Sequence, residues 1–148
     1  MNYLLKLIKI GVHLFRDVGI ASVNNGENGV FLSFKAGPPE GLVGHNQFDH
    51  LSFQLWRGDD LLGDPGYSKS SDDADMYSFM EQSIGHNTML VDFRGSGKKD
   101  HARIDVATGS ADGGFGVVCG NATQSYVVHS PLLQHVNEKK NFFFFIYF

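Results

Sequence analysis

Residues 51–62 read Leu51-Ser52-Phe53-Gln54-Leu55-Trp56-Arg57-Gly58-Asp59-Asp60-Leu61-Leu62, and this stretch decides the fold class. Leu51, Phe53 and Leu55 alternate with the polar Ser52 and Gln54, which is the period of a half-buried strand. The polar run at residues 57–60 surrounds a glycine and is typical of a turn, and an apolar strand resumes at residue 61. The stretch therefore predicts an antiparallel β-hairpin.

Further short strand candidates, separated by glycines, occur on both sides of this hairpin. They are residues 30–35, 87–93, 102–108, 114–119, 126–129, 132–137 and 142–148. Many short strands of this kind predict an all-β chain, folded as an antiparallel β-sandwich. Two segments have helical spacing instead, namely the amphipathic N-terminal stretch at residues 4–10 and a short helix after Ser71.

We accordingly divide the chain into a short N-terminal helix and linker at residues 1–18 and a β-sandwich domain at residues 19–148. The sequence ends in Asn-Phe-Phe-Phe-Phe-Ile-Tyr-Phe, an apolar run typical of a buried strand. A natural domain rarely stops on such a strand, so we expect the sandwich to be truncated at its C-terminus.

The composition argues against several classes of partner. The net charge of -4 provides no overall basic field for a nucleic acid. The apolar N-terminal stretch is interrupted by Lys6 and Lys9, is too short to span a membrane and lacks the pattern of a signal peptide. The single cysteine, Cys119, excludes an intrachain disulfide, and we expect a small buried side chain there.

Polar side chains gather in three clusters, each at the edge of an apolar strand: residues 44–53, 61–67 and 84–91. Together they supply imidazole, amide and carboxylate groups, a set that can coordinate a cation or transfer protons. No local metal motif such as CxxC or HExxH is present. From the residues alone, a metal-free hydrogen-bonded cluster therefore remains open, with Asp64 acting only as a turn residue.

The three clusters, in their order, resemble the heparinase II/III-like family, which also includes related alginate lyases. The motifs are His-Asn-Gln-Phe-Asp at 45–49 followed by Ser-Phe-Gln-Leu at 52–55, Leu-Leu-Gly-Asp-Pro-Gly-Tyr at 61–67, and Gly-His-Asn-Thr-Met-Leu-Val at 85–91. The resemblance is strongest from about residue 20 to residue 91. It implies a C-terminal, supersandwich-like β-sandwich, which in the family follows a helical α/α-toroid that this chain lacks.

The resemblance implies a polysaccharide lyase that cleaves uronic acid-containing chains, such as heparan sulfate or alginate, by β-elimination. His45 matches the family's active-site histidine. Tyr67 is a second catalytic candidate, because a C-terminal tyrosine takes part in proton transfer in the alginate-lyase relatives; its alternative role is packing. The other catalytic groups of the family come from the toroid, so we expect the fragment alone to be inactive.

The resemblance also implies a metal site at Gln47, Asp64 and His86. The heparinase III-like branch resembles this chain in having glutamine at the position of Gln47. Zinc prefers nitrogen and sulfur ligands, whereas an amide oxygen suits harder ions, so we expect one structural divalent cation, zinc or calcium-like. Asp49 and Asn87 are expected to hold the ligands in place.

An acidic polysaccharide is the expected partner, and the basic residues Arg94, Lys98 and Lys99 are the candidates to contact it, unless they form only a solvated hairpin. By analogy with the family, we expect a periplasmic or secreted location. A competing hypothesis is a non-catalytic β-sandwich that binds carbohydrate or only supports a fold, with a metal-stabilised strand cluster.

Overall fold

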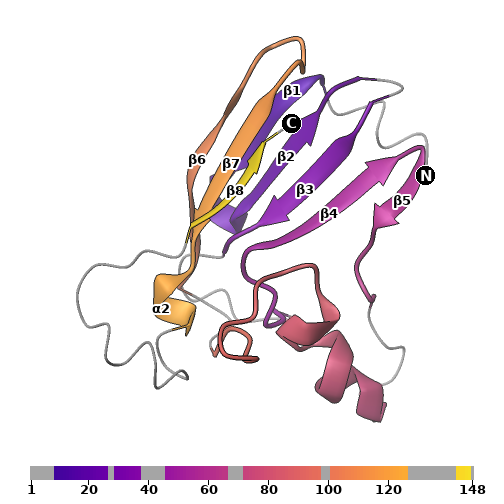
Figure 1. Cartoon of the computed structure of the whole chain (residues 1–148), viewed down its shortest axis with the longest axis vertical. Coiled ribbons are helices and arrows are strands. Elements are labelled where there is room, and N and C mark those ends of the chain that lie inside the picture. Colours follow the sequence, from indigo (N-terminus) through magenta and orange to yellow (C-terminus); the bar gives the residue numbers. More distant parts are fainter. Residues whose placement is uncertain are drawn as a thin grey trace.

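The computed structural model describes residues 9–26, 29–37, 46–66, 72–97, 101–126 and 143–147. The first sheet of the fold has five strands in the order β1-β2-β3-β4-β5. They are β1 (Gly11–Phe15), β2 (Ile20–Asn24), β3 (Phe31–Lys35), β4 (Ser52–Arg57) and β5 (Asp59–Leu62). All neighbours pair antiparallel, so the chain runs up and down across this sheet (Figure 1).

The hairpin predicted at residues 51–62 is confirmed as β4 and β5. Gly58 joins the two strands with a positive φ of 74°, which glycine adopts without steric cost. A register shift between Leu55 and Trp56 marks a bulge in β4. On the other side of β4, Leu55 lies opposite Leu32, and Leu32 lies opposite Val23 of β2, so the apolar residues line one face of the sheet.

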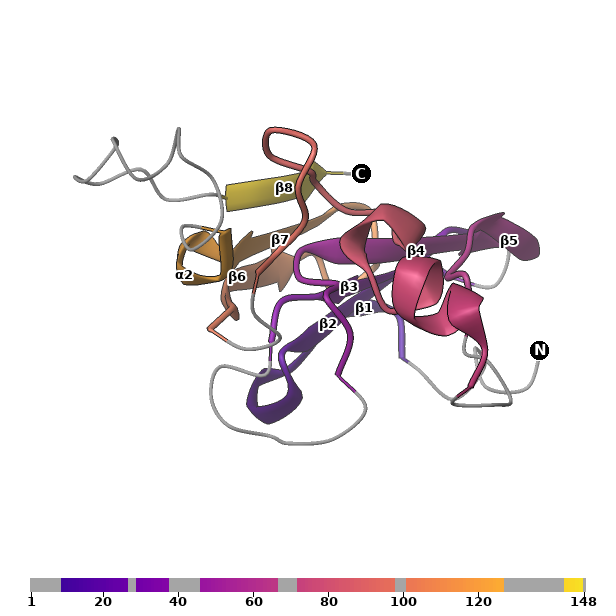
Figure 2. The ribbon, with the colours of Figure 1, turned by 90° about the horizontal axis from the view of Figure 1, so that it is seen from below.

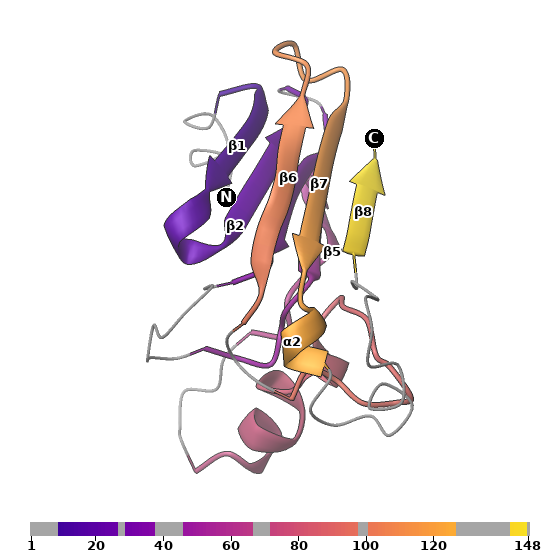
Figure 3. The ribbon, with the colours of Figure 1, turned by 90° about the vertical axis from the view of Figure 1, so that its left-hand side faces the viewer.

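The second sheet has three antiparallel strands in the order β6-β7-β8. They are β6 (Arg103–Gly109), β7 (Gly116–Asn121) and β8 (Phe143–Tyr147). Figure 3 shows this sheet in front of β1 and β2, and residues of β6 contact both strands. The described strands thus form two layers, which confirms the all-β sandwich predicted from the sequence.

The core lies between these two layers. It consists of small and medium apolar side chains from both sheets: Ala21, Val23, Leu32, Phe34, Ala36, Leu51, Ala102, Ile104, Val118, Ala122 and Tyr126. Gly120 of β7 lets the layers approach closely, because a Cβ there would lie 2.8 Å from atoms of Ala36, Leu51 and Phe34. A larger residue at position 120 would push the sheets apart.

The N-terminal boundary predicted at residue 18 is corrected by the structure. Gly11–Phe15 forms β1 and pairs with β2, so the sandwich includes residues that the sequence analysis assigned to a helix and linker. Val12 and Leu14 give only two apolar positions at strand spacing, too few to stand out after the longer apolar run before them. The helix expected at residues 4–10 lies almost wholly outside the described residues.

One further predicted strand is wrong, and a second is contradicted at its first residue. Residues 87–93 form bends and a tight turn with one isolated bridge, Val91 to Arg94; apart from the bond between the Asn87 carbonyl oxygen and the Phe53 amide, they show no ladder with a strand. Residues at 126–129 were predicted as a strand, but Tyr126 ends the short helix α2 (Thr123–Tyr126), and the remaining three residues lie outside the described structure. The strand expected at 132–137 lies there too.

The helical segments gather at one end of the sandwich. The helix predicted after Ser71 is present as η2 (Met76–Met80), followed by η3 (Ser83–Gly85), while η1 (Arg16–Val18) joins β1 to β2. Figure 1 shows η2 and α2 at the same end of the strands, and Figure 2 shows η2 on the side of β4 and α2 on the side of β6. Within the described part of the chain, no helix is long and apolar enough to cross a membrane.

The core assignment yields a stability prediction. Leu32 is 1% exposed, so Leu32→Ala should lower the free energy of unfolding by about 2–5 kcal/mol through lost burial and a residual cavity. The matched change Leu61→Ala removes a side chain that is 54% exposed and should cost less than about 0.5 kcal/mol. Urea unfolding of both variants measures the difference, and equal losses would contradict the assigned core.

Candidate functional site

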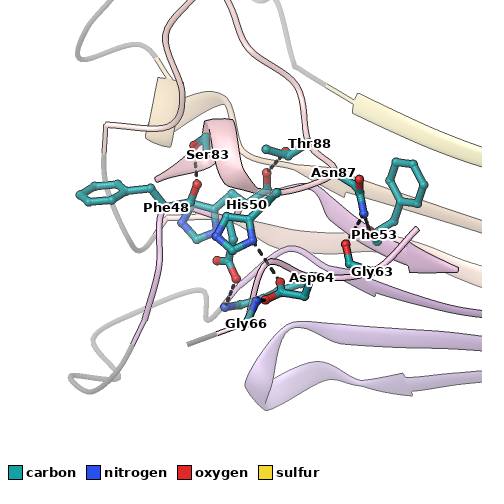
Figure 4. A network of polar contacts seen from close by, with 12 residues as sticks. Phe48, His50, Phe53, Gly63, Asp64, Gly66, Ser83, Asn87 and Thr88 are labelled. Atoms are coloured by element: carbon teal, nitrogen blue, oxygen red, sulfur yellow. Dashed lines mark hydrogen bonds and ion pairs between the residues drawn. The ribbon is translucent and has the colours of Figure 1, made fainter. Parts of the chain in front are cut away.

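Asn87 draws together the three polar clusters singled out in the sequence. Its side-chain amide donates to the carbonyl oxygen of Gly63 at 2.8 Å and to that of Phe53 at 3.2 Å. Its own carbonyl oxygen accepts the amide hydrogen of Phe53 at 3.1 Å. Figure 4 shows Asn87 beside Phe53 and Gly63. Asn87, predicted to hold ligands in place, therefore ties the third cluster to β4 and to the chain just after β5.

Asp64 and His86 lie side by side as a result. Nδ1 of His86 is 3.0 Å from Oδ2 of Asp64; the His86 side chain is 1% exposed and that of Asp64 is 32% exposed. Asp64 begins a tight Asp-Pro-Gly turn in which its Oδ1 accepts the amide hydrogen of Gly66 at 2.9 Å (Figure 4). Gly66 has a φ of 87°, a conformation that favours glycine at this position.

The surroundings of Asp64 favour its ionised form. Partial burial acts to raise the pKa of this carboxyl group. Hydrogen bonds from His86, the Gly66 amide and Gln54, with the electrostatic effect of His86, outweigh burial and hold the pKa below its usual value of 3.8. An ionised carboxylate only accepts hydrogen bonds, so the hydrogen between the two side chains belongs to Nδ1 of His86.

This arrangement leaves Nε2 of His86 as a buried nitrogen that no described group hydrogen-bonds. With the hydrogen on Nδ1, a neutral imidazole presents a lone pair at Nε2. A histidine whose Nδ1 donates to a carboxylate and whose Nε2 carries a lone pair is the form that binds metal ions. Nε2 of His86 is therefore oriented as a metal ligand would be, with Asp64 holding the ring from its other nitrogen; a cation held here stays a prediction.

The third predicted ligand, Gln47, is half-buried in the loop that precedes β4. No group of three or more histidine, cysteine, aspartate or glutamate side chains in the described ranges could hold a metal ion by itself, and an amide ligand lies outside that count. Asp49, three residues before β4 begins, contacts a different group: Nζ of Lys35 in β3 lies 2.6 Å from its Oδ2. The roles of both residues at a cation stay predictions.

The remaining predicted site residues are only partly covered by the structure. His45, Tyr67, Lys98 and Lys99 lie outside the described residues. Arg94 is exposed and closes the tight turn that begins at Val91. The structure thus brings together Asp64, His86 and Asn87 and shows the loop that carries Gln47 and Asp49.

Several residues near this site were missed by the sequence analysis. Gln54 of β4 hydrogen-bonds to Asp64. Ser83 and Thr88 donate to carbonyl oxygens of Phe48 and His50, in the loop that carries Gln47 (Figure 4). The only signal for Gln54 was that it is a polar residue in an apolar strand. A serine or threonine in a loop, such as Ser83 or Thr88, belongs to no sequence pattern that identifies a distant partner.

Comparison with known proteins agrees with this geometry. The family described as heparinase II/III-like, C-terminal matches residues 9–135, most of the chain. The chain belongs to this family. The match covers both sheets down to β7 and includes all three clusters, so the resemblance inferred from the motifs is confirmed. No curated protein matches the sequence.

Solved structures of heparinases share the fold. A heparinase III is 23% identical with a TM-score of 0.65, and the match covers 81% of this chain and 19% of that one. The heparan sulfate lyase HepC from Pedobacter heparinus is 21% identical with a TM-score of 0.65, covering 80% of this chain and 19% of the lyase. The chain thus spans about a fifth of the length of these neighbours.

The lowered pKa of Asp64 predicts how its contribution to stability depends on pH. In a buffer with a chelator, Asp64→Asn should melt below the wild type at neutral pH, because the ionised carboxylate accepts hydrogen bonds in the folded state. A depressed folded-state pKa means that this contribution is present above the usual value of 3.8 and is lost as the pH falls through the lowered pKa. Thermal unfolding across this range should show the two melting temperatures converging in acid; a gap that persists or widens there would contradict the assignment.

Proposed function

We propose that this chain is the C-terminal part of a polysaccharide lyase that cleaves a uronic acid-containing glycan by β-elimination. The observation that carries the proposal is the pairing of the buried His86 with the half-buried Asp64, in a chain of the heparinase II/III-like family.

The proposed reaction needs a base, an acid and stabilisation of negative charge. The base removes the proton on the carbon beside the sugar carboxylate, the electron pair forms a carbon–carbon double bond, and the bond to the glycosidic oxygen breaks. The departing oxygen takes up a proton from the acid. The carboxylate must be neutralised or hydrogen-bonded while charge develops on it, because the proton is only weakly acidic.

His45 is the proposed proton-transfer group of this chain. It stands two residues before Gln47 and three before Phe48, whose amide hydrogen and carbonyl oxygen are bonded to Glu81 and Ser83, just before the third cluster. An imidazole with an ordinary pKa near 6.5 can either donate or accept a proton at neutral pH. Tyr67, directly after the Asp-Pro-Gly turn, is the second candidate for proton transfer.

A divalent cation, zinc or calcium-like, is proposed to be held by Gln47, Asp64 and His86. Its charge would fix the first, second and third clusters to one another, which makes its role structural. The mixed donor set of an amide, a carboxylate and an imidazole suits ions of either kind. In this chain Asp64 orients the imidazole of His86, and Asn87 sets the distance between the two loops.

The substrate class and the missing partner come from the same family. The solved neighbours are named as heparinase III and heparan sulfate lyase, so we propose an acidic glycan of heparan sulfate type, with Arg94, Lys98 and Lys99 as contacts for its negative groups. The remaining catalytic groups would come from an N-terminal helical domain, which fits a chain that matches only 19% of those neighbours. A periplasmic or secreted location is part of this proposal.

The proposal predicts that the full-length protein releases unsaturated uronate products from heparan sulfate. Their double bond absorbs in the ultraviolet, so product formation can be followed directly with heparan sulfate and alginate as parallel substrates. His45→Ala should lower kcat by at least about a hundredfold, the effect expected when a proton-transfer group is lost. His13→Ala, a change in β1 that removes a partly exposed histidine, is the matched control and should leave kcat unchanged.

Release of product from alginate alone would place the chain with the alginate lyases. No product from either glycan, or equal rates for His45→Ala and the wild type, would contradict the catalytic proposal and leave a non-catalytic carbohydrate-binding domain.

A further inference from the structure

Two chains of hydrogen bonds connect α2 to the loop at residues 46–50. The first starts at Tyr126, which is 2% exposed and whose hydroxyl donates to the carbonyl oxygen of Met89 at 2.8 Å. Tyr126 thus holds the backbone directly after Thr88, the residue before Met89. The Thr88 hydroxyl in turn donates to the carbonyl oxygen of His50 at 2.5 Å (Figure 4). Burial raises the pKa of Tyr126, so its hydroxyl keeps its hydrogen at neutral pH.

The second chain starts one residue earlier in α2. The carbonyl oxygen of Ser125, a fully buried residue, accepts the amide hydrogen of Gly97 at 2.7 Å. The amide of the preceding residue, Ser96, donates to the Ser83 hydroxyl oxygen at 3.0 Å. The Ser83 hydroxyl donates to the carbonyl oxygen of Phe48. Each chain therefore ends on a carbonyl group of the same loop, two residues apart.

The packing around Ser83 leaves little freedom in the second chain. Ser83 is 3% exposed and Ser96 is 7% exposed, so water cannot easily replace either partner. A Cβ at Gly95 would overlap the Ser83 side chain, and only a glycine allows residues 95 and 96 to approach this closely. The amide of Phe48 adds a direct bond to the carbonyl oxygen of Glu81 at 2.8 Å.

We infer that α2, at the end of the second sheet, positions the loop at residues 46–50 through these two chains, and that Ser83, Thr88 and Tyr126 are positioning residues. The loop carries Gln47 and follows His45 directly, so its carbonyl anchors at Phe48 and His50 fix the backbone next to both residues. None of the three hydroxyls needs to touch the substrate. The effect of this positioning on catalysis rests on the proposed lyase function. The coupling between α2 and the loop at residues 46–50 does not.

Hydrogen exchange in the full-length protein tests the coupling. Tyr126→Phe keeps the ring in the core and removes only the hydroxyl, and Thr88→Val removes the hydroxyl that holds His50. Both should speed exchange of the Phe48 and Ser52 amides by about tenfold, the effect expected for one lost hydrogen bond. Thr88→Ser restores a hydroxyl and should return exchange toward the wild-type rate. The matched controls Tyr77→Phe, at a side chain 56% exposed, and Thr108→Val, at an exposed residue of β6, should leave these amides unchanged.

Steady-state kinetics of the variants distinguish a role in positioning the loop from a general effect on protein stability. A displaced loop should lower kcat by about tenfold or more in Thr88→Val, with KM changed much less and with rescue in Thr88→Ser, because small misplacements are costly at a reacting centre. Unchanged exchange at Phe48 and Ser52 in both Thr88→Val and Tyr126→Phe overturns the inference, and faster exchange with wild-type kcat overturns the positioning role in catalysis. If the wild type forms no product, only the proposed lyase function is contradicted. The hydrogen-exchange rates of the variants then test the coupling between α2 and the loop.

Discussion

The hydrogen bonds of Asn87 are the constraint on which the candidate site depends. One side-chain amide reaches the carbonyl oxygens of Phe53 and Gly63, which lie 34 and 24 residues earlier in the chain. The backbone carbonyl oxygen of Asn87 also accepts the amide hydrogen of Phe53, which aligns the loop after η3 with the start of β4. Because Phe53 lies in β4 and Gly63 directly follows β5, Asn87 holds the end of the β4–β5 hairpin against the third cluster.

The Asp64–His86 pair follows from this alignment. Asp64 comes one residue after Gly63, and His86 comes one residue before Asn87, so the Asn87–Gly63 bond brings their side chains within 3.0 Å. The carboxylate then orients the imidazole, and Nε2 is left as a buried nitrogen that no described group hydrogen-bonds. The candidate cation site thus depends on three features: two rigid sheets, the Asn87–Gly63 hydrogen bond and the oriented imidazole of His86.

The sequence predicted those parts of the fold that depend on local pattern. Alternation of Leu51, Phe53 and Leu55 and the turn at Gly58 gave the β4–β5 hairpin, and the order of three motifs identified the family. The pattern failed where tertiary contacts decide the structure: β1 has too few apolar positions, and the apolar residues Met89 to Val91 resemble a strand although Thr88 and Met89 bond to distant groups. Asp92 and Phe93 adopt positive φ angles, which no propensity of these residues would indicate.

The candidate site, like the fold, was predictable only where a sequence motif marked its residues. Asp64, His86 and Asn87 were identified through the motifs, and the structure brings them together. The supporting hydroxyls of Ser83, Thr88 and Tyr126 were not identified, because their partners are backbone carbonyl groups and no side-chain type in the sequence marks a carbonyl that needs a donor. Contacts of this kind become visible only in the folded chain.

The central claim is that the three clusters form one cation-binding site around His86. Elemental analysis of the purified full-length protein tests it most directly, with His86→Ala as the comparison and His13→Ala as the matched control. The account predicts one equivalent of a divalent cation in the wild type and in His13→Ala, and its loss in His86→Ala. A wild type without stoichiometric cation, or a His86→Ala variant that retains it, would contradict the account.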